Sequence, residues 1–129
     1  MTTEHGKSFA EASLARAEEA LTAAQTLVEK GLLADAISRA YYAMYYAAQA
    51  ILFSNHLSAK SHAGTISIFG KEIAEKGLVP KDFGKILHKA FNLRQKSDYE
   101  VDADFEPADV DKLIEQADNF ISTIKKTLS

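Results

Sequence analysis

The sequence predicts an all-α protein, specifically an up-and-down bundle of four to five helices. Apolar residues recur at three- and four-residue steps along most of the 129 residues, and no strand pattern competes strongly with them. Six glycines and two prolines are few for this length, which favours long helices joined by short loops. We expect one domain over residues 1–129, in which residues 1–7 form a flexible tail.

Two long helices are predicted in the first half of the chain, over residues 8–30 and 33–55. The first has one apolar stripe and ends at Gly31, since glycine readily takes the left-handed conformation that closes a helix. The second has an apolar stripe that includes Tyr41, and another stripe lies on roughly the opposite face. This other stripe consists of Arg39, Tyr42, Tyr46 and Gln49. A helix with two such faces is central in the bundle or contacts a second chain.

Three further helices are predicted in the second half. Either Ser58 or Ser61 can cap the first of them, and Gly77 ends it in the way that Gly31 ends the first helix of the chain. The other two open near prolines, which suit the first turn of a helix. The expected ranges are residues 60–76, 80–98 and 107–128.

Composition and missing motifs exclude several functional classes. The absence of cysteine removes disulfides, thiolate catalysis and cysteine-based zinc sites. The four histidines lack metal-ligand spacing and no glycine-rich nucleotide-binding motif occurs, so we expect neither a metal nor a cofactor. A net charge of −3 argues against capture of nucleic acid by a generally basic surface. No signal peptide or lipid-facing span is visible, which predicts a cytoplasmic protein without membrane contact.

Arg94 is the most informative residue of the fourth predicted helix. It continues the line of Phe83, Leu87 and Ala90, and we therefore expect it to be partly enclosed. An enclosed guanidinium requires an anion or a group of carbonyls. One interpretation is a structural ion pair with Asp98, four residues further on. The other is a contact to a phosphate, whose oxygens suit the planar guanidinium.

Arg39, Tyr42 and Tyr46 form a second group on one face of the second helix. An arginine with two aromatic rings can stack on a nucleobase and hold its phosphate. The same residue types are enriched in dimer interfaces, so this face predicts nucleotide binding, dimerisation or both. His62 follows Ser61 at a helix start, and we expect it either in the core near the cap or in the same cleft.

Three segments carry a family resemblance when they are taken together. They are residues 38–48 (SRAYYAMYYAA), 60–64 (KSHAG) and 93–99 (LRQKSDY). Over about residues 8–125 the chain resembles the HEPN superfamily, most of all its small stand-alone prokaryotic branch, the UPF0332 proteins. The resemblance implies a four- to five-helix bundle that usually dimerises and associates with nucleotides or RNA. It often implies a minimal nucleotidyltransferase as partner, in toxin–antitoxin or related defence modules.

Many members of this superfamily are metal-independent ribonucleases with an arginine followed, after four to six residues, by a histidine. Arg94 matches the arginine, but other residues occupy the positions for the histidine. They are Tyr99, Glu100 and Val101. Cleaving RNA through its 2′-hydroxyl needs proton transfer as well as charge stabilisation at phosphorus. Asp98 beside an arginine is a weak base, and His62 can serve only if folding brings it to Arg94.

We therefore expect a homodimer with a polar cleft. The cleft residues are expected to be Arg94, Asp98 and Tyr99, together with Arg39, Tyr42, Tyr46 and His62. The leading function is a nucleotide- or RNA-associated module that works with a nucleotidyltransferase-like partner and has little catalysis of its own. One alternative is a divergent metal-independent endoribonuclease that uses Arg94 with His62 or Tyr99. Another is a non-catalytic dimeric adaptor.

Overall fold

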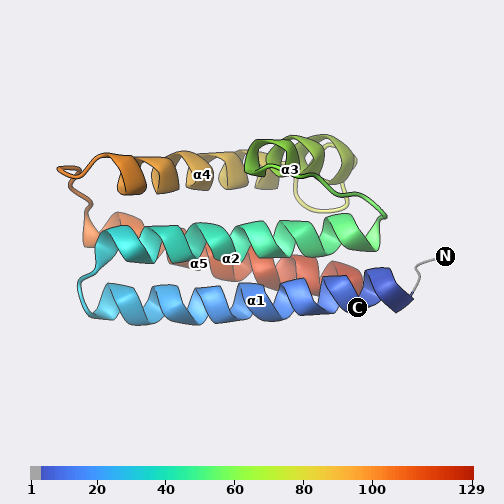
Figure 1. Ribbon diagram of the computed structural model, residues 1–129, viewed down its shortest axis with the longest axis horizontal. Coiled ribbons are helices and arrows are strands. Elements are labelled where there is room, and N and C mark those ends of the chain that lie inside the picture. The colour runs from blue at the N-terminus through green and yellow to red at the C-terminus, as the bar shows by residue number, and fades with distance from the viewer. Residues whose placement is uncertain (1–3) are drawn as a thin grey trace.

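The described part of the chain is helical, which confirms the all-α prediction (Figure 1). The computed structural model describes the backbone of residues 4–129 and the side chains of residues 8–129. The helices are α1 (Glu4–Glu29), α2 (Leu33–Ser54), α3 (His62–Phe69), the short π-helix η1 (Gly70–Ala74), α4 (Phe83–Tyr99) and α5 (Pro107–Leu128). Helix α1 thus begins within the predicted tail of residues 1–7, of which residues 1–3 lie outside the described residues.

Helix α2 is the central element of the bundle. It runs antiparallel to α1, while α5 crosses behind both and α3 and α4 form a layer along its other side (Figure 1). Contacts join α2 to each of the four other α-helices. The structure therefore confirms the interpretation that a helix with two decorated faces is central.

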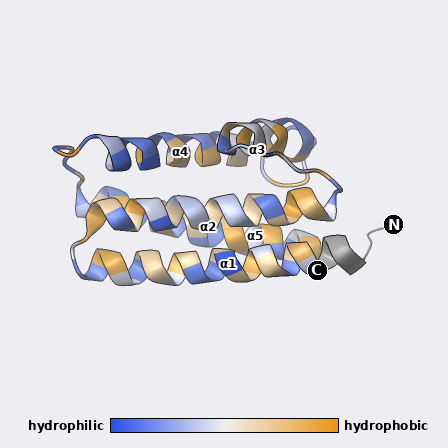
Figure 2. Cartoon of the chain, viewed as in Figure 1, coloured by the Kyte–Doolittle hydropathy of each residue, from blue (hydrophilic) through white to orange (hydrophobic). Residues whose placement is uncertain are grey.

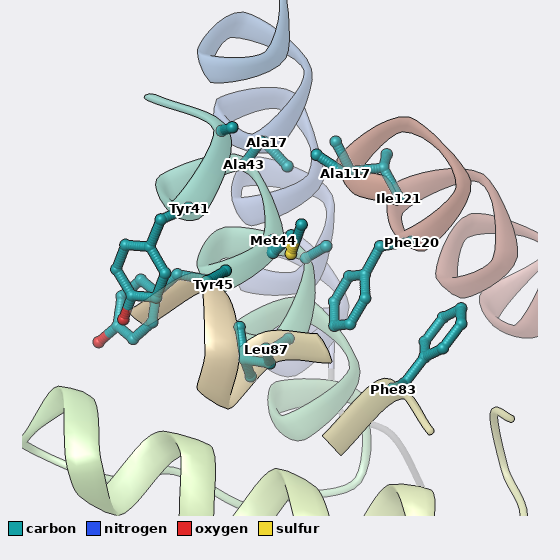
Figure 3. Packing of buried hydrophobic residues seen from close by; sticks show 14 of the residues in the cluster. Ala17, Tyr41, Ala43, Met44, Tyr45, Phe83, Leu87, Ala117, Phe120 and Ile121 are labelled. Carbon is teal, nitrogen blue, oxygen red and sulfur yellow. The ribbon is translucent and has the colours of Figure 1, made fainter. Parts of the chain in front are cut away.

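Small side chains line the contact between α1 and α2. All the fully buried residues among the described side chains of α1 are alanines, and six alanines of α2 are buried as well. Ala17 and Ala43 lie where the two helices meet, and Met44, Phe83 and Phe120 fill the space beyond them (Figure 3). Because small residues let two helices approach closely, α2 is enclosed on this side, and its buried tyrosines, Tyr41 and Tyr45, face the α3–α4 layer.

Two helices end with the same glycine cap, as predicted. Gly31 and Gly77 have positive φ angles of 76° and 77°. In each cap, the backbone N–H of the residue after the glycine donates to the carbonyl of the residue five positions earlier. Leu32 donates to Leu27 and Leu78 donates to Ile73, both at 3.0 Å. This pattern satisfies carbonyls that a helix end otherwise leaves without partners.

The third predicted helix differs from the structure in its second half. Ser61 is its cap, because the Gly64 N–H donates to the Ser61 Oγ at 2.9 Å. The expected single helix changes after Phe69 into a π-turn, in which the Glu75 N–H donates to the Gly70 carbonyl at 2.9 Å. A side chain on Gly84 would come within 3.5 Å of the Gly70 Cα, so the start of α4 packs closely on this turn.

The fourth helix begins at Phe83 rather than at Pro80. The Phe83 N–H donates to the Pro80 carbonyl at 3.0 Å, which closes a separate turn before the helix. Most of the visible surface of α4 is hydrophilic (Figure 2). Among the described residues, none of the helices has both the length and the apolarity that crossing a membrane requires.

Replacing either capping glycine by alanine should destabilise the protein. Alanine at a positive φ costs about 1–2 kcal/mol, so Gly31→Ala and Gly77→Ala should each lower the free energy of unfolding by roughly that amount. Gly70→Ala is the matched control, because Gly70 has a helical φ of −59° and a Cβ added to it would meet nothing within 4 Å. Urea denaturation measures the unfolding free energy of all three variants. A loss of stability in Gly70→Ala as large as in the other two would contradict the role of the positive φ.

Candidate functional site

Two buried tyrosines of α2 hold the histidine that begins α3. Tyr41 and Tyr45 lie one helical turn apart, and their rings lie side by side (Figure 3). The Tyr41 hydroxyl is 2.7 Å from Nδ1 of His62, and the Tyr45 ring stacks on the imidazole at 4.2 Å and 12°. We call Tyr41 and Tyr45 the inner tyrosines. They fix the imidazole both by a hydrogen bond and by a flat ring contact.

Two further tyrosines of α2 are only half-buried, and arginines lie over their rings. We call Tyr42 and Tyr46 the outer tyrosines; their centroids are 5.8 Å apart. The Arg39 guanidinium lies 4.8 Å from the Tyr42 centroid, and that of Arg16 lies 5.2 Å from the Tyr46 centroid. An Arg16 amine also donates to the Tyr46 hydroxyl at 3.4 Å. Such contacts hold a guanidinium in place while leaving its edges open to a ligand.

Arg94 of α4 joins the inner and outer tyrosines. Its guanidinium lies 5.3 Å from the Tyr42 centroid and 5.8 Å from the Tyr41 centroid, and its side chain is only 21% exposed. This position confirms that Arg94 is partly enclosed at the end of an apolar line. The fold thus brings guanidiniums from α2 and α4 to the same ring, that of Tyr42.

The predicted pair of Arg94 and Asp98 is present, but its geometry is imperfect. Nε of Arg94 is 2.9 Å from Oδ2 of Asp98. Nε is nevertheless buried without an aligned hydrogen bond, because its N–H does not point at the carboxylate oxygen. We therefore describe the contact as an ion pair only. An enclosed guanidinium whose donor is not well satisfied has capacity left for a further anion.

Burial and a neighbouring charge favour the neutral form of His62. Burial, and then the positive charge of Arg94, hold the pKa of His62 below its ordinary value of 6.5. Burial likewise raises the pKa of Tyr41 far above its ordinary value, so its hydroxyl stays protonated. Nε2 of His62 has no hydrogen bond with the described residues and is not sealed from solvent. When Nδ1 donates to the Tyr41 oxygen, Nε2 has a free lone pair and can accept a proton.

The structure brings most of the predicted site residues together, although Tyr99 lies apart from them. Arg39, Tyr42, Tyr46, Arg94 and His62 form one connected group of rings and guanidiniums. Asp98 joins it through Arg94. Tyr99 is 77% exposed, and no ring contact or hydrogen bond links it to these residues.

Sequence reasoning missed Arg16 and the inner tyrosines as parts of the site. Arg16 lies off the apolar stripe of its helix and meets Tyr46 thirty residues away, so no local spacing signals the contact. The sequence placed Tyr41 in the apolar stripe and Tyr45 in neither stripe, although their hydroxyls are polar groups that need a partner when buried. The described His, Asp and Glu residues do not form a group of three or more that could hold a metal ion.

Comparison with known proteins identifies the family. The family model described as HEPN domain matches residues 10–127. The chain belongs to the HEPN family. A relative named "Putative toxin" from Methanocaldococcus jannaschii is 41% identical over 112 residues, which cover 87% of this chain and 83% of the relative. The site described above is therefore the tyrosine- and arginine-bearing face of a HEPN domain.

The UPF0332 branch is also confirmed by relatives that have this name. A UPF0332 protein from Gloeobacter violaceus is 45% identical over 84 residues, which cover 65% of this HEPN chain and 67% of the relative. Another from Thermotoga maritima is 34% identical over 113 residues, which cover 88% and 86% of the two chains. The resemblance stated from the three sequence segments is thus correct.

Removing the charge of Arg94 should raise the pKa of His62. In Arg94→Gln the pKa should move up towards 6.5 but stay below it, because burial remains. Arg39→Gln removes the same charge from the same face. It should leave the pKa of His62 unchanged, because Arg39 does not contribute to the lowering of that pKa. Titration of the imidazole by NMR measures both. Equal shifts of the His62 pKa in the two variants would contradict a specific influence of Arg94 on the imidazole.

The lowered pKa of His62 also predicts how stability depends on pH. Below pH 6.5 the unfolded chain binds a proton at His62 that the folded chain resists, so acidification destabilises the fold. This loss begins as the pH falls through 6.5 and is complete below the pKa of the folded chain. The difference in unfolding free energy between the wild type and His62→Gln should therefore shrink on acidification, as measured by urea denaturation.

Proposed function

We propose that this HEPN protein is a toxin-type module that binds nucleotides or RNA and works with a minimal nucleotidyltransferase-like partner. The observation that carries the proposal is the placement of the Arg39 and Arg94 guanidiniums at 4.8 and 5.3 Å from the Tyr42 centroid. The names of its relatives support a toxin–antitoxin or defence setting. In that setting the partner would be the antitoxin.

The chemistry of the Tyr42 neighbourhood suits a nucleotide. Arg39 forms no ion pair with the described residues, and Arg94 shares its charge with Asp98 only through an imperfect contact. A phosphate would supply the missing acceptors, since guanidinium groups bind phosphate oxygens in pairs. The half-buried tyrosine rings beside them give a base a surface on which to stack. Both halves of a nucleotide therefore have a candidate contact.

A homodimer belongs to the proposal. The outer tyrosines and their arginines stay partly exposed in a single chain, and tyrosine and arginine are enriched where two proteins meet. A second chain across this face would exclude water and strengthen the contacts between guanidiniums and phosphate. The non-catalytic adaptor is the limiting case, in which this face serves dimerisation alone.

A second candidate function is metal-independent cleavage of RNA. The observation that favours it is the contact of His62 and Arg94 with the same two rings, Tyr41 and Tyr42. In the tautomer in which Nδ1 donates to the Tyr41 oxygen, Nε2 of the neutral imidazole is able to take the proton of a 2′-hydroxyl, and Arg94 is able to stabilise the charge at phosphorus. His62 would then supply from α3 the histidine that the α4 motif lacks.

Loss of both guanidiniums should abolish most of the binding. We expect Arg39→Ala with Arg94→Ala to weaken single-stranded RNA binding by about 100-fold, because hydrogen bonds to charged groups contribute about 1.5–3 kcal/mol each. Lys125→Ala with Lys126→Ala removes the same charge from the end of α5 and should change affinity only slightly. Fluorescence anisotropy at constant salt measures both. Unchanged binding in the arginine variant would refute the proposal.

RNA cleavage separates the two candidate functions. The leading function expects RNA to stay intact when it is incubated with the protein and a chelator. The second candidate expects cleavage that leaves 2′,3′-cyclic phosphate ends and falls by about 100-fold or more in His62→Gln. Gel analysis of labelled RNA distinguishes them. Cleavage that persists in both His62→Gln and Arg94→Gln would point to a contaminating nuclease.

A further inference from the structure

A third arginine extends the site along α2, away from Arg94. The side chain of Arg16 comes from α1, is 63% exposed and lies over the Tyr46 ring. Along the outer tyrosines the arrangement thus repeats: Arg39 lies over Tyr42, and one helical turn further on Arg16 lies over Tyr46. The 5.8 Å between the two ring centroids separates these two units.

A hollow lies between the two units. It has a volume of about 210 Å³ and is lined by Arg16, Glu19, Ala20, Ala23, Arg39 and Tyr46. Ala20 and Ala23 contribute only short side chains to its lining, and two arginines and a tyrosine border the space. Its one carboxylate, Glu19, is 4.0 Å from Nε of Arg16, a distant ion pair at the surface. Such a pair is weak and gives way to a better-placed anion.

We propose that this hollow is a second phosphate subsite, in which Arg16 and Arg39 hold a phosphate of a single-stranded nucleic acid. The proposal rests on the proposed function and deepens it, because it makes the ligand a strand of at least two nucleotides rather than a free mononucleotide. Arg94 and Arg39 hold one phosphate beside Tyr42. Arg39 also borders the hollow, where it holds the next phosphate together with Arg16, which Tyr46 positions.

The repeated unit favours a strand over a nucleoside triphosphate. A triphosphate concentrates its charge behind a single base and suits one compact group of cations. Here the guanidiniums are spread over two outer tyrosines, Arg39 and Arg94 at Tyr42 and Arg16 at Tyr46, and they come from three helices. Alternating charge and aromatic surface is how proteins follow a single strand without reading its sequence.

The length dependence of binding tests this subsite. The probes are AMP, ATP and a labelled oligonucleotide of about ten nucleotides, within the range that single-strand sites cover. In Arg16→Gln the oligonucleotide should bind about tenfold more weakly and its salt slope should fall by about one, as for the loss of one phosphate contact. AMP should bind as it does to the wild type. The oligonucleotide is tested both as RNA and as DNA. A loss of affinity in Arg16→Gln for either one supports the subsite.

Glu19 and Glu18 supply a matched pair of charge variants. Glu19→Gln removes the carboxylate that lines the hollow and should strengthen oligonucleotide binding several-fold by freeing Arg16. Glu18→Gln changes the net charge equally, but Glu18 pairs with Lys125 of α5 at 2.9 Å and should have a much smaller effect. Equal effects of the two variants would show a general influence of charge and overturn the subsite.

The remaining outcomes separate this inference from the proposed function. If the wild type binds neither AMP nor the oligonucleotide, both fail. If Arg94→Gln weakens oligonucleotide binding while Arg16→Gln does not, the proposed function stands and the subsite is wrong. If Arg16→Gln weakens the binding of ATP as much as that of the oligonucleotide, the hollow binds a triphosphate, and the proposal of a single-stranded ligand is wrong.

Discussion

Tyr41 joins the hydrophobic core of this protein to its candidate site. Its ring is fully buried in the central helix, where it meets Tyr45 and Phe91, yet its hydroxyl must find a partner. His62 provides that partner and is thereby fixed at the start of α3. Arg94 then lies over the same ring. Tyr41 of α2 thus contacts α3 through its hydroxyl and α4 through its ring.

The contacts of Tyr41 also explain how the site contains a histidine although the α4 motif lacks one. Arg94 and His62 come from different helices, and they meet only because both contact Tyr41 and Tyr42. The proximity has a cost, since the guanidinium opposes a second positive charge on the imidazole and lowers its pKa.

Alanines determine which side of α2 packs closely against α1. Small residues bring α1 close along one side, so that the large tyrosines must point towards α3 and α4 or out to solvent. The same close approach places Arg16 of α1 within reach of Tyr46. Packing in the core and the layout of the surface therefore follow from one distribution of small and large residues.

The sequence by itself determined the helices, most of their ends and the faces they bury. The span of α5 and the caps at Gly31 and Gly77 were predictable because helical periodicity and glycine's access to positive φ are local properties. Tertiary structure alone decided that Arg16, His62 and Arg94 meet on the tyrosines of α2. These residues come from three separate helices, and the distances between them depend on how the helices pack, which no spacing along the chain encodes.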